Sequence, residues 1–77
     1  MTTYEVYLHY PEKRRDTDTG IIVEYVRKHL QSFRTRHEAI GFADTQSLSS
    51  KDYVYVCQIE NKKKSTEQTV YHRTLAK

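Results

Sequence analysis

The segment YVYVCQIE, residues 53–60, constrains the fold of this chain more than any other stretch. It is filled by β-branched and aromatic residues, which favour the pleated surface of a β-sheet. Near the N-terminus, TTYEVYLHY alternates between two sets of side chains, as a strand with one buried face does. These two segments lie far apart in a chain of 77 residues, so they predict a sheet built from distant parts of the sequence.

The segment IIVEYVRKHLQSF, residues 21–33, fits either a helical stripe or a strand. The next residues favour the strand, because Thr35 and Glu38 form a capping box and a helix start needs a non-helical residue before it. Where the alternation slips, near Tyr25 and Val26, we expect a β-bulge. If residues 21–33 were helical instead, the element order would be β-α-α-β-β.

The remaining elements are predicted from turn residues and composition. Pro11 is expected to end the first strand, and the polar run from there to Gly20 to form a loop. TVYHRTL, residues 69–75, predicts the last strand, joined to residues 53–60 by a long loop over residues 61–68. The sequence therefore predicts one α+β domain, residues 1–77, with a four-stranded antiparallel sheet, one helix on one face and the order β-β-α-β-β.

Composition points to a folded cytoplasmic protein. Charged residues make up 30% of the chain and hydrophobic ones 36%, a balance typical of folded domains. Cys57 is the single cysteine, so no intramolecular disulfide can form, and small secreted domains usually depend on disulfides. Because no export signal or membrane-length apolar run occurs, we expect a soluble, cytoplasmic chain without a membrane partner.

The stretch DTDTG, residues 16–20, looks like three catalytic or metal-binding motifs. An aspartic-protease triplet or a phosphotransfer pair needs a buried apolar strand before it, but Lys13, Arg14 and Arg15 stand there. A calcium loop would need a third acid and a distal bidentate glutamate. We therefore expect a solvated hairpin loop in which Gly20 supplies a permissive backbone.

Other catalytic and metal-binding patterns are weak. Cys57 and His72 could meet on neighbouring strands, but no oxyanion motif accompanies them, and a cysteine in a strand is more often a packing residue. The histidines lack the spacing of a helical zinc pair; they are His9, His29, His37 and His72. We expect a non-enzymatic protein with no cofactor and no metal.

Charge and aromatic residues carry the functional hypothesis. Residues 61–77 hold five basic residues against one acidic residue, so the excess of positive charge lies at the C-terminal end. Segments 6–8 and 51–56 partly resemble the two short motifs of RNA-recognition-motif domains, although Asp52, Val54 and Gln58 and the order of elements depart from them. The resemblance implies a type of surface, in which bases stack on exposed aromatic side chains.

If the valines of the strands face the helix, four tyrosines share the open face of the sheet; in the opposite register they lie in the core. The predicted contact residues are Tyr7, Tyr53, Tyr55, Tyr71, Lys62, Lys63, Lys64 and Arg73. The sequence thus favours a small binding module for nucleic acid or a nucleoprotein complex. The alternative is a protein-interaction module, such as a phage or mobile-element inhibitor or adaptor of the anti-CRISPR kind, that docks on a larger protein or forms a homodimer.

Overall fold

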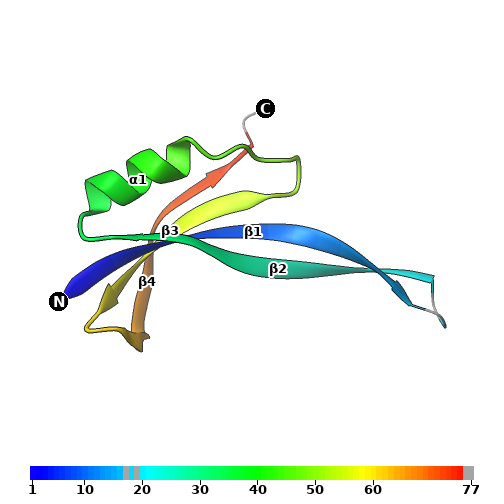
Figure 1. The fold of residues 1–77 in the computed structure, drawn as a ribbon, viewed down its shortest axis with the longest axis horizontal. Helices are drawn as coiled ribbons and strands as arrows, with labels where there is room; N and C mark the ends of the chain where they lie inside the picture. The colour runs from blue at the N-terminus through cyan, green and yellow to red at the C-terminus, as the bar shows by residue number, and fades with distance from the viewer. Residues whose placement is uncertain (17, 19, 76–77) are drawn as a thin grey trace.

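A twisted four-stranded antiparallel sheet carries one helix on one of its faces (Figure 1). The computed structural model describes residues 1–16, 18 and 20–75, apart from the side chains of Arg14 and Asp16. The chain runs through β1 (Thr2–Asp16), β2 (Gly20–Phe33), α1 (Arg36–Asp44), β3 (Tyr53–Glu60) and β4 (Lys63–Thr74), and the strands lie in the order β2-β1-β3-β4. The predicted fold class and element order are confirmed, including the strand over residues 21–33.

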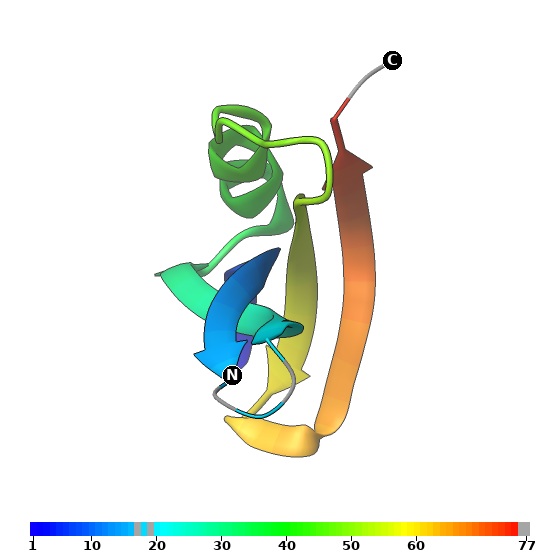
Figure 2. The same cartoon turned by 90° about the vertical axis from the view of Figure 1, so that its right-hand side faces the viewer.

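The core lies between α1 and the centre of the sheet (Figure 2). Five residues there are fully buried: Val6, Ala39, Ala43, Val54 and Val56. Both helical members are alanines, and such small side chains let the helix backbone approach the valines of β1 and β3 closely. The core is therefore small, and it fixes which face of each central strand is turned towards the helix.

The predicted capping residue begins the helix. Thr35 has an extended backbone, and its side-chain oxygen accepts a hydrogen bond from the Glu38 backbone N–H at 3.3 Å. The Glu38 carboxylate accepts from the Thr35 hydroxyl at 2.8 Å, so the two side chains close the first turn together.

The first two strands extend beyond the rest of the sheet as a two-stranded arm, formed by residues 10–16 and 20–26 (Figure 1). The prediction that Pro11 ends the first strand and that a loop runs from there to Gly20 is wrong, because β1 continues to Asp16. β3 pairs with β1 only as far as His9, so Pro11 lies beyond the end of β3. Its missing N–H therefore breaks no hydrogen-bond ladder on the β3 side of β1.

The arm closes in the DTDTG stretch. β1 ends at Asp16 and β2 begins at Gly20, whose φ of +93° lies in the left-handed region that favours glycine. The expected hairpin connection and the permissive role of Gly20 are confirmed. Two residues of the motif, Thr17 and Thr19, lie outside the described residues.

A bulge in β2 falls at Leu30 and not near Tyr25 and Val26, where the sequence predicted it. The register shifts between Val6 and Tyr7, which leaves Leu30 without a partner, whereas Tyr25 and Val26 pair regularly with β1. Because of the extra residue, both Leu30 and Phe33 pack against the core on the helix side.

The connection between β3 and β4 is a tight turn, not the expected long loop over residues 61–68. Asn61 and Lys62 both have positive φ, 50° and 60°, as a two-residue type I′ hairpin requires. Lys63 and Lys64 therefore belong to β4. The polar residues that follow them remain strand-forming because most of this edge strand is exposed to solvent.

Candidate functional site

The face of the sheet turned away from α1, here called the open face, carries aromatic and imidazole rings from all four strands. Strand register places Tyr7 between His29 on β2 and Tyr55 on β3, with His72 opposite Tyr55 on β4. The rings in mutual contact are Tyr7, His9, Tyr25, His29, Tyr53, Tyr55 and His72.

His9 is stacked between two tyrosines. Its ring centroid lies 5.3 Å from that of Tyr25, with 14° between the planes, and 4.4 Å from that of Tyr53, with 21°. Tyr53 also contacts His72 at 4.8 Å, so the contacts reach from the base of the arm to β4. His9 Nδ1 is buried, and within the described part of the chain it has no hydrogen-bond partner.

Arg27 lies over Tyr7 and beside Tyr55. Its guanidinium carbon is 4.3 Å from the centroid of Tyr7, and Nη1 donates to the Tyr55 hydroxyl at 3.4 Å. The same Nη1 lies 3.4 Å from Glu67 Oε1 on β4. Because β2 and β4 are the two edges of the sheet, this ion pair reaches across the open face and covers its centre.

These contacts keep the two phenols neutral and the guanidinium charged. Burial raises the pKa of Tyr7 and of Tyr55, and this outweighs the opposing effect of the Arg27 charge. The hydrogen bond to Tyr55 raises the pKa of Arg27 in turn. Arg27 is therefore a fixed cation at the centre of the open face.

A second polar group lies beside Tyr7. Glu5 accepts hydrogen bonds from Ser32 and from His29 Nε2, the latter at 2.8 Å. Burial alone would raise the pKa of Glu5, but the hydrogen bonds from Ser32, Thr3 and His29 outweigh it and lower the pKa. The carboxylate is thus ionised and held by partners on its own face.

Two open pockets flank the ion pair of Arg27 and Glu67. One, of about 420 Å³, is lined by Thr3, Glu5, Tyr7, Ser32, Ile59, Lys62 and Lys64. The other, of about 360 Å³, is lined by Tyr53, Tyr55, Glu67, Thr69 and His72. Both lie on the open face, so this face is hollowed on either side of Arg27.

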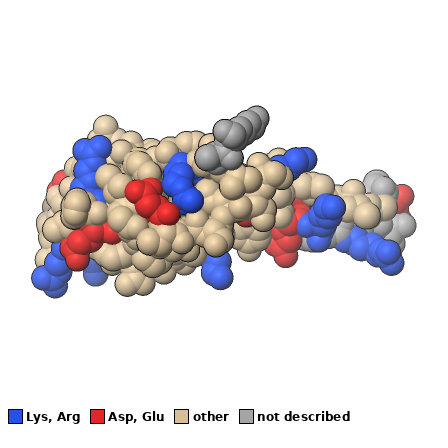
Figure 3. Space-filling view, turned by 90° about the horizontal axis from the view of Figure 1, so that it is seen from above, with Lys and Arg blue, Asp and Glu red and all other residues tan. Residues whose placement is uncertain are grey.

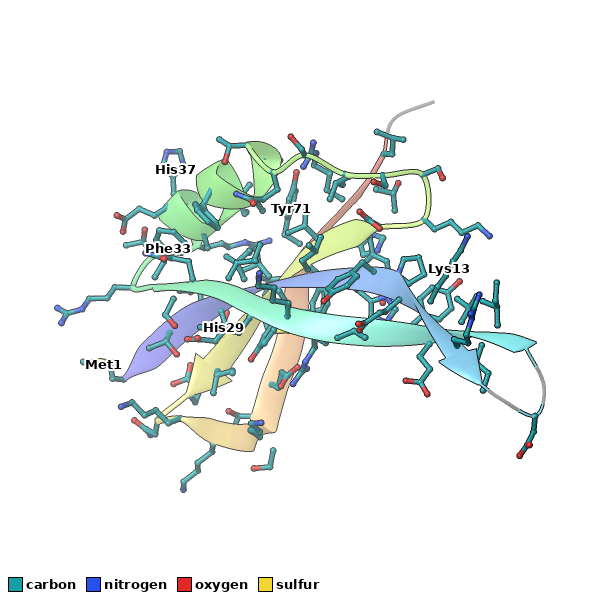
Figure 4. The ribbon with its side chains drawn as sticks, turned by 45° about the vertical axis from the view of Figure 1, so that its right-hand side comes forward. Met1, Lys13, His29, Phe33, His37 and Tyr71 are labelled. Carbon is teal, nitrogen blue, oxygen red and sulfur yellow. The ribbon has the colours of Figure 1, made fainter. Side chains whose placement is uncertain are left out.

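Of the four predicted tyrosines, Tyr7, Tyr53 and Tyr55 lie on the open face, and Tyr71 does not. Figure 4 shows Tyr71 on the helix side of the sheet and His29 on the other. Tyr71 pairs with Val56, packs against the core and donates its hydroxyl hydrogen bond to Asp44. The cause is a bulge beside Val56 that shifts the alternation of β4.

The predicted basic residues also lie in different parts of the structure. Lys62 and Lys64 line the larger pocket, while Lys63 is exposed and paired in register with Glu60. Arg73 lies apart from these lysines, because it donates to the Ala43 and Gln46 carbonyls at 2.9 and 3.0 Å beside the C-terminal end of α1. Seen from above, Lys and Arg side chains are spread along the body and the arm (Figure 3).

Sequence reasoning missed Arg27 and the three histidines of the open face. The alternation that places Tyr7 on this face also places His9 there, so this signal was present in the sequence. Alternation did not place His29 and His72 on this face, because a bulge in each of their strands interrupts the alternation of side chains.

Cys57 lies opposite Thr69, so it does not face His72 across the strands. Burial, together with the hydrogen bond to Glu67, raises the pKa of the Cys57 thiol to about 11. The thiol is therefore protonated at neutral pH, which is unsuited to a nucleophile. Among the described residues, no group of three or more His, Cys, Asp or Glu side chains is arranged to hold a metal ion.

The chain matches no protein-family model, and neither the curated proteins nor the solved structures contain a significantly similar chain. In the described part of the chain, α1 is far too short to cross a bilayer, and no other helix is long and apolar enough to do so.

Proposed function

We propose that the open face binds nucleic acid, with bases stacked on its exposed rings and phosphates held by cations at its margin. The observation that carries this proposal is the continuous contact of seven aromatic and imidazole rings across all four strands. Every base offers a flat π face, so such a surface accepts bases with little dependence on sequence.

The rings divide into a supporting and a contacting group. Tyr7 is only 8% exposed and is covered by Arg27, so it supports the others from below. Tyr25, His29 and His72 are exposed and are positioned to meet a ligand.

The acids of the open face are paired within it, which favours an anionic ligand. Glu5 is held by His29 and Ser32, and Glu67 by Arg27. The cations Lys62 and Lys64 stand beside the larger pocket. Contacts between such cations and phosphates release counterions, so the affinity should fall steeply as salt rises.

The test is fluorescence anisotropy of labelled single-stranded oligonucleotides, at low and at physiological salt. We expect Lys62→Glu/Lys64→Glu to weaken binding at least about tenfold and to reduce the salt dependence. Arg34→Glu/Lys51→Glu makes the same change of charge outside the open face and should weaken binding less than about threefold. His72→Ala should weaken binding with an unchanged salt dependence.

Absence of binding at low salt would contradict the proposal. The second candidate would then lead: a protein-interaction module, such as an inhibitor or adaptor that docks on a larger protein. It is favoured by an exposed apolar row on an edge strand, in which Ile21, Val23 and Tyr25 are 67%, 50% and 59% exposed. Sedimentation of the protein alone would separate a homodimer from a monomer that needs another partner.

A further inference from the structure

The arm has two chemically different faces. Strand register places Arg15 opposite Ile21, Lys13 opposite Val23, and Pro11 opposite Tyr25. Since Tyr25 stacks on His9, these three pairs continue the open face along the arm. The alternate pairs, which include Glu12 opposite Glu24, face the other way.

The first of these faces combines positive charge with apolar surface. On the continuation of the open face, a column of cations on β1, Lys13 and Arg15, runs beside a column of exposed apolar residues on β2. Among the described side chains of the two strands of the arm, the acidic ones, Glu12 and Glu24, lie on the opposite face. A ligand with negative charge beside apolar surface fits the first face.

The dimensions of the arm select among anionic ligands. Two paired strands lie about 4.8 Å apart, and no third strand widens the arm, because β3 pairs with β1 only as far as His9. The major groove of B-form DNA is about 12 Å wide and admits a two-stranded ribbon, whereas the major groove of A-form RNA is too narrow. At about 3.3 Å per residue, residues 10–16 of β1 span about 20 Å, or roughly six base-pair steps.

We propose that the arm binds in the major groove of duplex DNA whose adjoining strand is unpaired and lies on the open face. Lys13 and Arg15 contact phosphates at the edge of the groove, while Ile21 and Val23 contact apolar base edges such as thymine methyl groups. Tyr25 stands where the strand leaves the duplex. This inference rests on the proposed function and names its ligand: a junction between duplex and single-stranded DNA.

The experiment compares three labelled DNA probes: a duplex of about 16 base pairs, the same duplex with a single-stranded overhang of about eight nucleotides, and a single strand. We expect the native chain to bind the duplex with overhang at least about tenfold more tightly than either other probe. Lys13→Glu/Arg15→Glu should remove this advantage while changing single-strand binding less than about threefold.

Two control variants keep the test specific. Glu12→Gln/Glu24→Gln alters the opposite face of the arm and should leave the advantage intact. Ile21→Ser/Val23→Ser keeps every charge and should reduce the advantage without changing the salt dependence. Circular dichroism checks that each variant is folded, and a matching RNA duplex with overhang should show no advantage over single-stranded RNA.

Each contrary outcome overturns a defined part of the proposal. If the overhang gives no advantage, or if Lys13→Glu/Arg15→Glu weakens all three probes equally, the arm does not bind a groove, although the open face still binds single strands. If no probe binds even at low salt, the proposed function fails together with this inference. Self-association lost in Ile21→Ser/Val23→Ser would then assign the apolar row to a second copy of the chain.

Discussion

The body of the protein and its arm use the same kind of strand for different purposes. In the body, α1 covers one face of the sheet, and Val6, Val54 and Val56 are fully buried beneath it. In the arm, Ile21 and Val23 are β-branched residues of the same type, yet they are 67% and 50% exposed. The body therefore holds the fold together, while the arm displays apolar and basic side chains that contribute little to the stability of the monomer.

This difference shows how a small chain can present a long contact surface. The fully buried cluster holds five residues, which are too few to pack against the whole length of β1 and β2. Antiparallel pairing satisfies the inward-facing backbone groups of the arm without a core, while solvent reaches the outward-facing ones. The twist of a two-stranded ribbon suits a curved ligand. The contrast between body and arm can be tested by substitutions whose expected effects range from large to small.

The same substitution should have very different effects in the two regions. Val56→Ala leaves a cavity in the core and should lower the free energy of unfolding by about 2–3 kcal/mol. Val23→Ala removes the same atoms from an exposed site and should lower it by less than about 1 kcal/mol. Urea denaturation measures both values, and equal losses would show that the arm is part of the core.

Arg73 should act on stability and not on ligand binding. Arg73→Ala removes the hydrogen bonds to the Ala43 and Gln46 carbonyls and should lower the free energy of unfolding by about 1–2 kcal/mol. The salt dependence of nucleic-acid binding should stay that of the native chain. If instead the salt dependence falls, as is expected for Lys62→Glu/Lys64→Glu, Arg73 contacts phosphates after all.

The two hairpin turns should respond in opposite ways. Lys62 holds a φ of 60°, so Lys62→Gly should raise the free energy of unfolding by about 1 kcal/mol. Gly20→Ala places a side chain at a φ of +93° and should loosen the tip of the arm. Hydrogen exchange should then show lower protection in the arm with unchanged protection in β3, whereas a loss of protection in β3 would mean that the two regions unfold together.

The smallest expected effect is on stability at acidic pH. Because hydrogen bonds lower the pKa of Glu5 in the folded state, its contribution to stability is present above the ordinary value of 4.5 and is lost as the pH falls through the lowered pKa. Glu5→Gln should therefore make the thermal midpoint fall less over this range. Glu12→Gln, an exposed change on the arm, should keep the native profile; identical profiles for all three proteins would contradict the assignment.

Local sequence features predicted much of the fold. Residues 53–60 form a strand with the expected bounds, and Thr35 begins the helix, because capping and alternation act between near neighbours. The expectation for Pro11 was wrong, because a proline disrupts a strand only where its missing N–H would have bonded a neighbouring strand. The long loop expected over residues 61–68 was wrong because polar residues also form an exposed edge strand.

The candidate surface was less predictable than the fold. Alternation placed Tyr7, Tyr53 and Tyr55 on one face, and the buried valines decided that this face is the open one. Tyr71 and Arg73 lie on the helix side, because a bulge at Val70 changes the parity of β4. Arg27 and Glu67 belong to opposite edges of the sheet, and no spacing in the sequence predicts that they meet.

The sequence by itself determined the kind and order of the elements, since propensity, capping and turn chemistry are local properties of the chain. Only the tertiary structure decided where the bulges fall, which rings stack and how far the arm projects. The physical reason is that strand register is chosen by packing against a shared core, and a shift of one residue moves every later side chain to the other face.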